Sequence, residues 1–525
     1  MIRPNVADTI ALTLQAHGVR HGFGMPGGEV VTMIDALVTA GIQFHLARHE
    51  TAAAIMAAGV SVLEDVPGLL VTTVGPGLTN AVNGIADASQ ERVPLLVISG
   101  IVDRPTRARY THQVIDHAAV LRPFVKASFE VEAESAAATV TRALALAMQH
   151  PRGPVHLDLS PATAALPALD QPSGPVPVSL PSLCADDPAL RNLAARLSAA
   201  ERPLIIAGFE AACLGADVAG LGVPVFTTYK AKGIIPEDHP LAMGGIGLSP
   251  AADKIALDLI ARSDLVLAIG YDPIEMRLGW LDPSDRLVEV TGAPADHAMH
   301  GASLRFLACP AEVCALLPGL ITPRPQWQDM AAETRQALRT KFETPKPWGP
   351  HAIIETLNTV SPETVVTVDS GAHRILLSQK WQAMQPLTLL QSAGFCTMAA
   401  ALPLAIGAAT ATGQRTIAVM GDGGLEMCAG ELATLRDLGL PVTVIVFQDQ
   451  SLALIAMKQA QAGLPSGAVT LGLTDFAALA RAFGGAGVTV SDARTLAQEL
   501  ADARDRAGFT LIACRFDADD YRNSF

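Results

Sequence analysis

The glycine-rich run Gly421–Gly424 lies between two strand-like segments and constrains the fold of the C-terminal third of the chain. Apolar and β-branched residues precede it at 417–420 and follow at 442–447, while residues 426–438 have the pattern of a helix that stops at a glycine. Such a strand–loop–helix–strand unit predicts parallel strands whose carboxyl ends share one sheet edge, where α/β proteins bind ligands.

Each of these two strands is followed by a carboxylate, Asp422 and Asp449. Two hard oxygen ligands suit Mg²⁺, which keeps few protein ligands and takes the rest from phosphate and water. The glycines let backbone N–H groups approach a phosphate. The pattern therefore predicts a metal–diphosphate site that is neither a Walker A loop nor GxGxxG. The alternative is that Gly-Asp-Gly forms only a tight turn.

The bulk properties favour an acidic, multidomain protein. A chain of 525 residues predicts about three domains. The net charge of −14 and the lack of a basic cluster argue against nucleic-acid binding and docking on anionic membranes. The longest apolar stretch, 398–412, contains Pro403 and Gly407 and is shorter than the ~20 residues of a membrane span, so it predicts a buried helix.

The seven cysteines are scattered, with no CxxC pair, which is typical of buried thiols in a reducing cytoplasm. The first residues lack the apolar region of a signal peptide. We therefore expect a cytoplasmic protein.

Helical and strand-like segments alternate along nearly the whole chain, which indicates α/β architecture with parallel sheets. Composition breaks occur at 166–188, which is rich in Pro, Ser and Asp, and on both sides of a charged helix at 327–342. The first and last blocks could share a fold, although the sequence alone does not show it. We expect three domains, at 1–168, 186–325 and 345–525.

The N-terminal block has polar signals of its own. A short strand at 44–47 runs through Arg48 and His49 to Glu50, which opens an Ala-rich helix. This glutamate could simply satisfy the helix dipole. A second strand, 69–73, enters the glycine turn Gly75–Asn80. Two glycine turns and a glutamate in separate domains suggest a ligand held between domains.

Six short motifs form a combination that is more specific than any one of them: Phe23–Gly28, Arg48–Glu50, Gly75–Asn80, Val93–Leu95, Gly153–Val155 and Gly421–Gly423. With it the chain resembles, over essentially its full length, the thiamine-diphosphate-dependent enzymes of the acetohydroxyacid synthase/2-oxo acid decarboxylase superfamily. The resemblance implies three parallel-sheet α/β domains: pyrimidine-binding, central Rossmann-like and diphosphate-binding.

Within that superfamily the chain is most similar to catabolic acetolactate synthases. His112–Asp116 resembles their His-Gln-x-x-Asp stretch, and Ile269–Glu275 and Asp520–Asn523 resemble two further segments. Asp449 stands where most of the superfamily has Asn. The biosynthetic synthases contact FAD through a segment that Tyr271–Pro273 replaces here, so FAD is not expected.

The resemblance implies roles for single residues. Glu50 would hydrogen-bond the aminopyrimidine ring and act as acid/base through the cofactor. Gln113 would be a second catalytic residue, on the substrate side. Met398 would bend the cofactor, and the carbonyl of Cys396 would accept from its amino group.

The diphosphate and its ion form the second set of implied contacts. Asp422, Asp449 and the carbonyl of Ser451 would hold Mg²⁺. Gly421, Gly423 and Gly424 would complete the cofactor site. Glu50 and the diphosphate site come from different subunits in this family, which implies a homodimer or homotetramer with interfacial active sites. Candidates for substrate contact are Gly27, His112, Gln113 and Leu452.

Four polar residues in the N-terminal block have a second, structural interpretation. His112 and His117 are active-site candidates, although a histidine beside a loop is more often structural. Lys126 could meet a substrate carboxylate or be a solvated charge. Asp116 could only cap a helix.

The expected reaction is decarboxylation of a 2-oxo acid, with pyruvate as first candidate, and ligation to a second 2-oxo acid. The loop at 448–455 and the run at 391–396 depart from the catabolic pattern near the substrate pocket. The alternative is therefore a non-ligating decarboxylase or a 2-hydroxy ketone lyase acting on a larger substrate. A scaffold without turnover is disfavoured by the intact Glu50 and Asp422.

Overall fold

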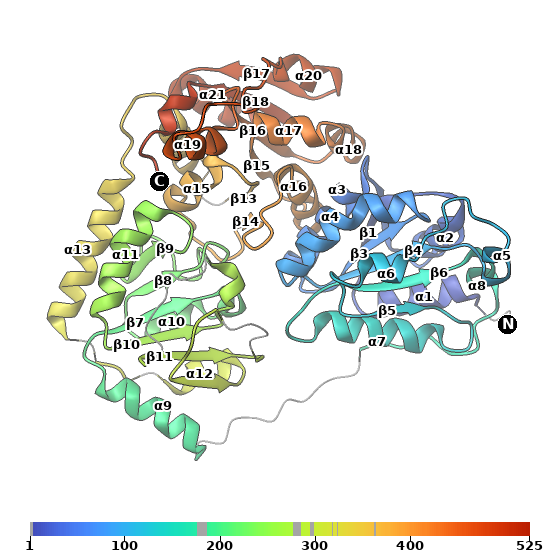
Figure 1. The fold of residues 1–525 in the computed structure, drawn as a ribbon, viewed down its shortest axis with the longest axis horizontal. Helices are drawn as coiled ribbons and strands as arrows, with labels where there is room; N and C mark the ends of the chain where they lie inside the picture. Colours follow the sequence, from blue (N-terminus) through green and yellow to red (C-terminus); the bar gives the residue numbers. More distant parts are fainter. Residues whose placement is uncertain are drawn as a thin grey trace.

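Three six-stranded sheets, all with parallel strands, make up the fold of the computed structural model (Figure 1). The structure describes residues 4–175, 186–276, 285–294, 299–317, 319–322, 324–361 and 364–525. This confirms the predicted α/β class. Residues 176–185 of the expected linker, and Pro323 in the second break, lie outside the described residues, whereas Leu166 and Ala168 still pair with the N-terminal segment.

The N-terminal sheet has the order β2-β1-β3-β4-β6-β5. Its strands are β1 His21–Met25, β2 Gln43–Leu46, β3 Gly68–Thr72, β4 Leu95–Gly100, β5 Ser128–Glu130 and β6 Val155–Leu159. The helices are α1 Val6–Ala16, η1 Gly28–Val30, α2 Val31–Thr39, α3 Glu50–Glu64, α4 Pro76–Gln90, α5 Arg104–Arg107, α6 His117–Leu121, α7 Ala136–Met148 and α8 Pro161–Ala165.

The C-terminal sheet repeats this arrangement, β14-β13-β15-β16-β18-β17, so the first and last blocks share one topology. Its strands are β13 Val365–Val368, β14 Leu389–Gln391, β15 Thr416–Gly421, β16 Val442–Gln448, β17 Ala486–Val490 and β18 Thr510–Arg515. The helices are α14 Pro350–Val360, α15 Ala372–Lys380, α16 Ala401–Thr412, α17 Asp422–Cys428, α18 Glu431–Leu438, α19 Ala453–Gln461, α20 Phe476–Ala482, α21 Ala493–Asp505 and η4 Ala518–Tyr521.

The central sheet, β12-β11-β10-β7-β8-β9, has the strand order of a dinucleotide-binding Rossmann domain. Its strands are β7 Pro203–Ala207, β8 Val225–Thr227, β9 Ala242–Gly245, β10 Leu265–Ile269, β11 Leu287–Thr291 and β12 Leu304–Leu307. The helices are α9 Pro188–Ala199, η2 Phe209–Ala211, α10 Gly215–Gly220, α11 Pro250–Arg262, η3 Pro273–Glu275, α12 Pro310–Leu316 and α13 Pro325–Lys341.

The hydrophobic cores join neighbouring domains. The Ala-rich helix α3 packs on α16, so one core continues from the N-terminal into the C-terminal sheet (Figure 1). A Cβ at Gly407 would lie 2.2 Å from the carbonyl oxygen of Met56, so these helices cross at a distance that only glycine allows there. A second core links the central domain to the C-terminal one through α11, α13 and α14.

One expectation from the sequence is corrected and another is confirmed. The single helix expected at 426–438 is two helices, because α17 already begins at Asp422 and the chain breaks at Ala429 and Gly430 before α18. The apolar stretch that starts at Met398 contains α16, and its buried side chains confirm a buried helix. None of the described helices is long and apolar enough to cross a membrane.

Candidate functional site

A cavity of about 110 Å³ opens at the carboxyl ends of β13, β15 and β16. It lies where the strand order of the C-terminal sheet reverses, which is where ligands bind in open parallel sheets. The predicted residues Gly421–Gly424, Asp449, Ser451, Leu452 and Met398 all line it. The glycine run and the second carboxylate therefore meet at one sheet edge, as the sequence predicts.

The two carboxylates of the cavity are anchored by the backbone. Asp422 accepts hydrogen bonds from the N–H groups of Gly423 at 2.8 Å and Gln450 at 2.7 Å. Asp449 accepts from the N–H of Ser451 at 2.9 Å. Burial raises the pKa of Asp422; burial and the neighbouring charge of Asp422 raise the pKa of Asp449 to about 7. A divalent cation bound by both would relieve their repulsion, so this donor set fits Mg²⁺.

One wall of this cavity was not predicted from the sequence. The segment Ser370–His373, which follows β13 and opens α15, lines the cavity beside the glycine run. The ring of His373 is fixed by Asp369, whose Oδ1 lies 2.9 Å from its Nε2. A Cβ at Gly424 would lie 2.3 Å from Asp369 Oδ2, so the two loops touch. A strand that ends in Asp-Ser-Gly before a helix is the signal that could have revealed this wall.

Met398 and Cys396 lie on the approach to the glycine run. The methyl group of Met398 would be 3.9 Å from a Cβ at Gly423. Cys396 does not line the cavity; it adopts a left-handed φ of 58° and its N–H donates to Ser392 Oγ at 2.8 Å. Its thiol contacts Arg374, with Nη2 3.3 Å from Sγ.

Glu50 opens α3 and is buried. Its Oε2 accepts a hydrogen bond from Asn80 Nδ2 at 3.1 Å, and His49 caps the same helix by accepting from the N–H of Thr51. The alternative role, a helix-start carboxylate, describes its position but leaves its burial beside the glycine turn unexplained.

The glycine turn after β3 gathers other predicted residues of the N-terminal domain. Gly77 lies against Glu50, with a Cβ there 3.4 Å from Oε1. A Cβ at Gly27 would lie 2.2 Å from Thr73 Oγ1, and one at Gly75, where φ is +57°, would lie 2.4 Å from the carbonyl oxygen of Gln113. Gly27, Glu50 and Gln113 therefore converge on one turn.

The four polar residues that had a second, structural interpretation have different surroundings in the structure. Asp116 caps α6 by accepting from the N–H of Ala119 at 2.9 Å. Lys126 donates to two backbone carbonyls, of Leu146 and Gln149, at 2.5 Å each. These two residues have structural roles, whereas His112 is exposed on the loop next to Gln113.

His117 is buried and supports the glycine turn from below. Gly75 donates its N–H to His117 Nε2 at 3.1 Å, so the ring proton sits on Nδ1, which lies 2.8 Å from Asp158 Oδ1. Burial opposes ionisation of Asp158, but hydrogen bonds from His117 and His156 hold its pKa below the usual range. His117 therefore shapes the turn that holds Gln113.

Within one chain the two groups of residues remain apart. None of the described residues 4–168 lines the cavity at the C-terminal sheet. The segment before Glu50 instead docks on α18, where Glu431 accepts from the N–H of Arg48 at 3.0 Å and Arg48 also pairs with Asp437. Within one chain, the residues around Glu50 therefore do not contribute to the lining of this cavity.

A larger cavity, about 540 Å³, lies between the N-terminal and central domains at the carboxyl edge of the central sheet. Two backbone N–H groups at this edge are occupied by carboxylates of the chain. Glu210 accepts from the N–H of Gly292 at 3.0 Å, and Glu275 accepts from the N–H of Phe209 at 3.2 Å. Burial raises the pKa of Glu275 to about 7.

Family models match all three domains. The model of the thiamine pyrophosphate enzyme N-terminal TPP binding domain matches residues 4–120, that of the central domain 190–317, and that of the C-terminal TPP binding domain 369–514.

The chain is also similar to other proteins over nearly its full length. The acetolactate synthase isozyme 3 large subunit of Escherichia coli is 30% identical over 95% of this chain and 92% of its own. The catabolic acetolactate synthase of Raoultella terrigena is 28% identical over 98% and 95%. The Pseudomonas aeruginosa protein named "Probable 2-ketoarginine decarboxylase AruI" is 29% identical over 96% and 92%.

Proposed function

The chain belongs to the thiamine-diphosphate-dependent acetohydroxyacid synthase/2-oxo acid decarboxylase superfamily, and on this premise we propose that it decarboxylates pyruvate and joins the retained two-carbon unit to a second 2-oxo acid. The observation that carries the proposal is the pair of carboxylates, buried Asp422 and half-buried Asp449, beside the glycine run at the C-terminal sheet edge. Bound thiamine diphosphate would supply the electron sink for the electrons left when CO₂ departs.

We propose that Asp422, Asp449 and the carbonyl of Ser451 hold Mg²⁺ against the diphosphate. The proximity of the two acids supports this, because a cation removes the repulsion that raises the pKa of Asp449. Gly421, Gly423 and Gly424 leave room for a diphosphate beside the metal, and the first turn of α15 offers further N–H donors.

On the pyrimidine side, Glu50 would hold the ring proton through a hydrogen bond, and Asn80 would keep the Glu50 carboxylate oriented. Gln113 would contact the substrate from the loop above the glycine turn, with Gly27, His112 and Leu452 around it. Met398 would press on the cofactor beside Gly423.

Because these halves lie apart in one chain, we propose a homodimer or a dimer of dimers in which Glu50 of one protomer serves the diphosphate site of its partner. We propose further that the protein works without FAD, because Glu210 and Glu275 accept from the N–H groups of Gly292 and Phe209, so these two donors are not free for a dinucleotide phosphate. The described cysteines, none of them in a disulfide, support a cytoplasmic location.

The substrate pocket leaves a second candidate. Leu452, Leu454 and Ile455 line the cavity with apolar side chains where the catabolic pattern differs, and one full-length relative is named as a decarboxylase of a larger 2-oxo acid. This favours a non-ligating decarboxylase, or a 2-hydroxy ketone lyase, as the alternative.

Product analysis with pyruvate, thiamine diphosphate and Mg²⁺ decides between the candidates. The proposal expects CO₂ release that needs both additions, with acetolactate as the product. Acetaldehyde as the sole product, or turnover only with a larger 2-oxo acid or a 2-hydroxy ketone, would establish the alternative. No CO₂ or ketone cleavage from any of these would refute both.

A further inference from the structure

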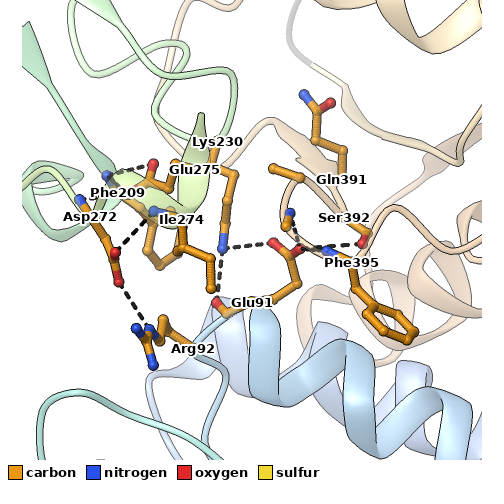
Figure 2. A network of polar contacts seen from close by, with 12 residues as sticks. Glu91, Arg92, Phe209, Lys230, Asp272, Ile274, Glu275, Gln391, Ser392 and Phe395 are labelled. Carbon is orange, nitrogen blue, oxygen red and sulfur yellow. Dashed lines mark hydrogen bonds and ion pairs between the residues drawn. The ribbon is translucent and has the colours of Figure 1, made fainter. Parts of the chain in front are cut away.

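Glu91, the residue that ends α4, carries a buried carboxylate that contacts both other domains (Figure 2). Its Oε2 lies 2.9 Å from Nζ of Lys230 in the central domain. Its Oε1 accepts hydrogen bonds from the N–H groups of Gly394 at 2.6 Å and Phe395 at 3.2 Å in the C-terminal domain, and lies 3.2 Å from Ser392 Oγ. One side chain thus joins all three domains.

Lys230 contacts Glu91 at two points, the side chain and the backbone carbonyl. Its Nζ also donates to the backbone carbonyl of Glu91 at 2.8 Å and lies 4.9 Å from the centroid of the Phe209 ring. Burial opposes ionisation of both partners, but the charge of each stabilises the ionised form of the other. The pKa of Glu91 therefore lies below its ordinary value and that of Lys230 above it. The pair is therefore ionised inside the protein.

The turn that presents Glu91 is fixed from the central domain as well. The next residue, Arg92, adopts a left-handed φ of 58°, a conformation that a non-glycine side chain keeps only where surrounding contacts impose it. The Nε of Arg92 lies 2.9 Å from Asp272 Oδ2 (Figure 2). The central domain therefore binds two consecutive residues of the N-terminal domain, Glu91 and Arg92.

The segment that Glu91 holds leads directly into the proposed cofactor contacts. Ser392 accepts from the N–H of Cys396 at 2.8 Å, and Met398 follows two residues later. Cys396 and Ala399 both adopt left-handed φ values, 58° and 64°. Surrounding contacts must stabilise such a strained segment, so its position depends on the groups that bind its N–H donors.

We propose that Glu91 is a positioning residue: its carboxylate, oriented by Lys230 of the central domain, fixes the backbone of residues 392–396 and so sets where Cys396 and Met398 meet the cofactor. The cofactor contacts of Cys396 and Met398 rest on the proposed function. The role of Glu91 in fixing the backbone of residues 392–396 does not. It gives the central domain a task in the reaction, since this domain supplies the cation that keeps the Glu91 carboxylate ionised and in place.

The test compares Glu91→Gln with wild type in the full-length protein. The amide keeps the shape of the side chain but loses the charge that strengthens hydrogen bonds to the N–H groups of Gly394 and Phe395. Hydrogen–deuterium exchange, read by mass spectrometry without cofactor, should be about tenfold faster across 392–396. With thiamine diphosphate, Mg²⁺ and pyruvate, kcat should fall by about 10²-fold while KM changes little.

The matched control is a neighbouring buried ion pair. Lys232 lies two residues from Lys230; its side chain is fully buried, whereas that of Lys230 is 10% exposed. It pairs with Glu237 at 2.7 Å and, among the described residues, has no ion pair with 392–396. Lys232→Met should lower thermal stability as much as Lys230→Met. It should leave both the exchange of residues 392–396 and kcat at wild-type values.

The double variant Glu91→Gln/Lys230→Met separates positioning from stability. Removing both charges should restore much of the stability that each single change loses, because no charge is left stranded. The kcat should stay as low as in Glu91→Gln. Recovery of kcat with stability, or unchanged exchange of residues 392–396 in Glu91→Gln, would overturn the inference. A wild-type protein without pyruvate turnover would refute the proposed function instead, and the exchange result would still decide the position of residues 392–396.

Discussion

Asp422 and Asp449 illustrate how a binding site is built at the cost of local stability. Burial raises the pKa of both carboxylates, and the charge of Asp422 further disfavours ionisation of Asp449. Such a pair is expected where a cation binds, which supports the proposed Mg²⁺ site. Both residues could be identified from the sequence because each directly follows an apolar strand, whereas Asp369 and His373 carried no paired glycine run and were missed.

The metal assignment predicts different outcomes for the two acids. Asp422→Ala should abolish retention of thiamine diphosphate, since it removes a metal ligand and the acceptor for the N–H groups of Gly423 and Gln450. Asp449→Asn should bind the cofactor nearly normally and melt at a higher temperature without it, because the repulsion is gone. Calorimetric titration with and without Mg²⁺ measures both. Tight, metal-independent binding to Asp422→Ala would disprove the assignment.

His45 makes a prediction about acid stability. Burial, and then the neighbouring His21, lower its pKa from 6.5 to about 4; its Nε2 lies 3.1 Å from His21 Nδ1. Between these pH values the unfolded chain binds more protons than the folded one, so stability falls as pH drops through this window. From about pH 7 to pH 5, His45→Gln should lose about 2 kcal/mol less than wild type. Urea titrations of the first unfolding transition measure this, and parallel losses would contradict it.

At the level of elements, the alternation of strands and helices predicted the three parallel sheets and their ligand-binding edges. The break between α17 and α18 was not predictable, because a helical pattern runs through it and the reason for it is tertiary. Glu431, the first residue of α18, accepts from the N–H of Arg48 at 3.0 Å, so the start of α18 is bound to the N-terminal domain. Local patterns predict elements, but contacts between domains decide where they end.

The crossing of α3 and α16 gives an element-scale prediction. Gly407→Ala should destabilise the protein by about 1–3 kcal/mol, because the added methyl would collide with the carbonyl oxygen of Met56 and push the helices apart. Gly220→Ala, at the end of α10 with no atom within 4 Å of the new Cβ, is the control and should be near neutral. Thermal melts compare them; equal melting temperatures would show that the crossing tolerates the methyl.

At the scale of the whole molecule, the sequence could not predict which residues meet between domains. Glu91, Lys230 and Gly394 belong to three separate blocks, and no local pattern marks any of them as a partner of the others. The matching strand orders of the first and last sheets were likewise hidden, because topology depends on pairing and not on composition. Only the fold shows that Glu50 lies outside the cavity that Asp422 and Asp449 line in the same chain.

That separation predicts complementation between inactive chains. Glu50→Gln and Asp422→Ala proteins should each be nearly inactive alone. Mixed by co-refolding, they should recover about a quarter of wild-type activity, because half of random dimers are mixed and each mixed dimer has one intact site. The assay is CO₂ release from pyruvate. No recovery, with mixed dimers demonstrated by mass, would mean that each site is built from a single chain.

The central claim is that Glu50 acts on the pyrimidine ring of a cofactor whose diphosphate is bound through Mg²⁺ by Asp422 and Asp449, and proton exchange tests it most directly. The exchange of the thiamine C2 proton for deuterium, followed by NMR after acid quench, should be far faster on the wild-type protein than in free cofactor. Glu50→Gln should slow it by about 10²–10⁴-fold while cofactor affinity changes little. Exchange in Glu50→Gln as fast as in wild type would reduce Glu50 to a helix-start carboxylate and contradict the account.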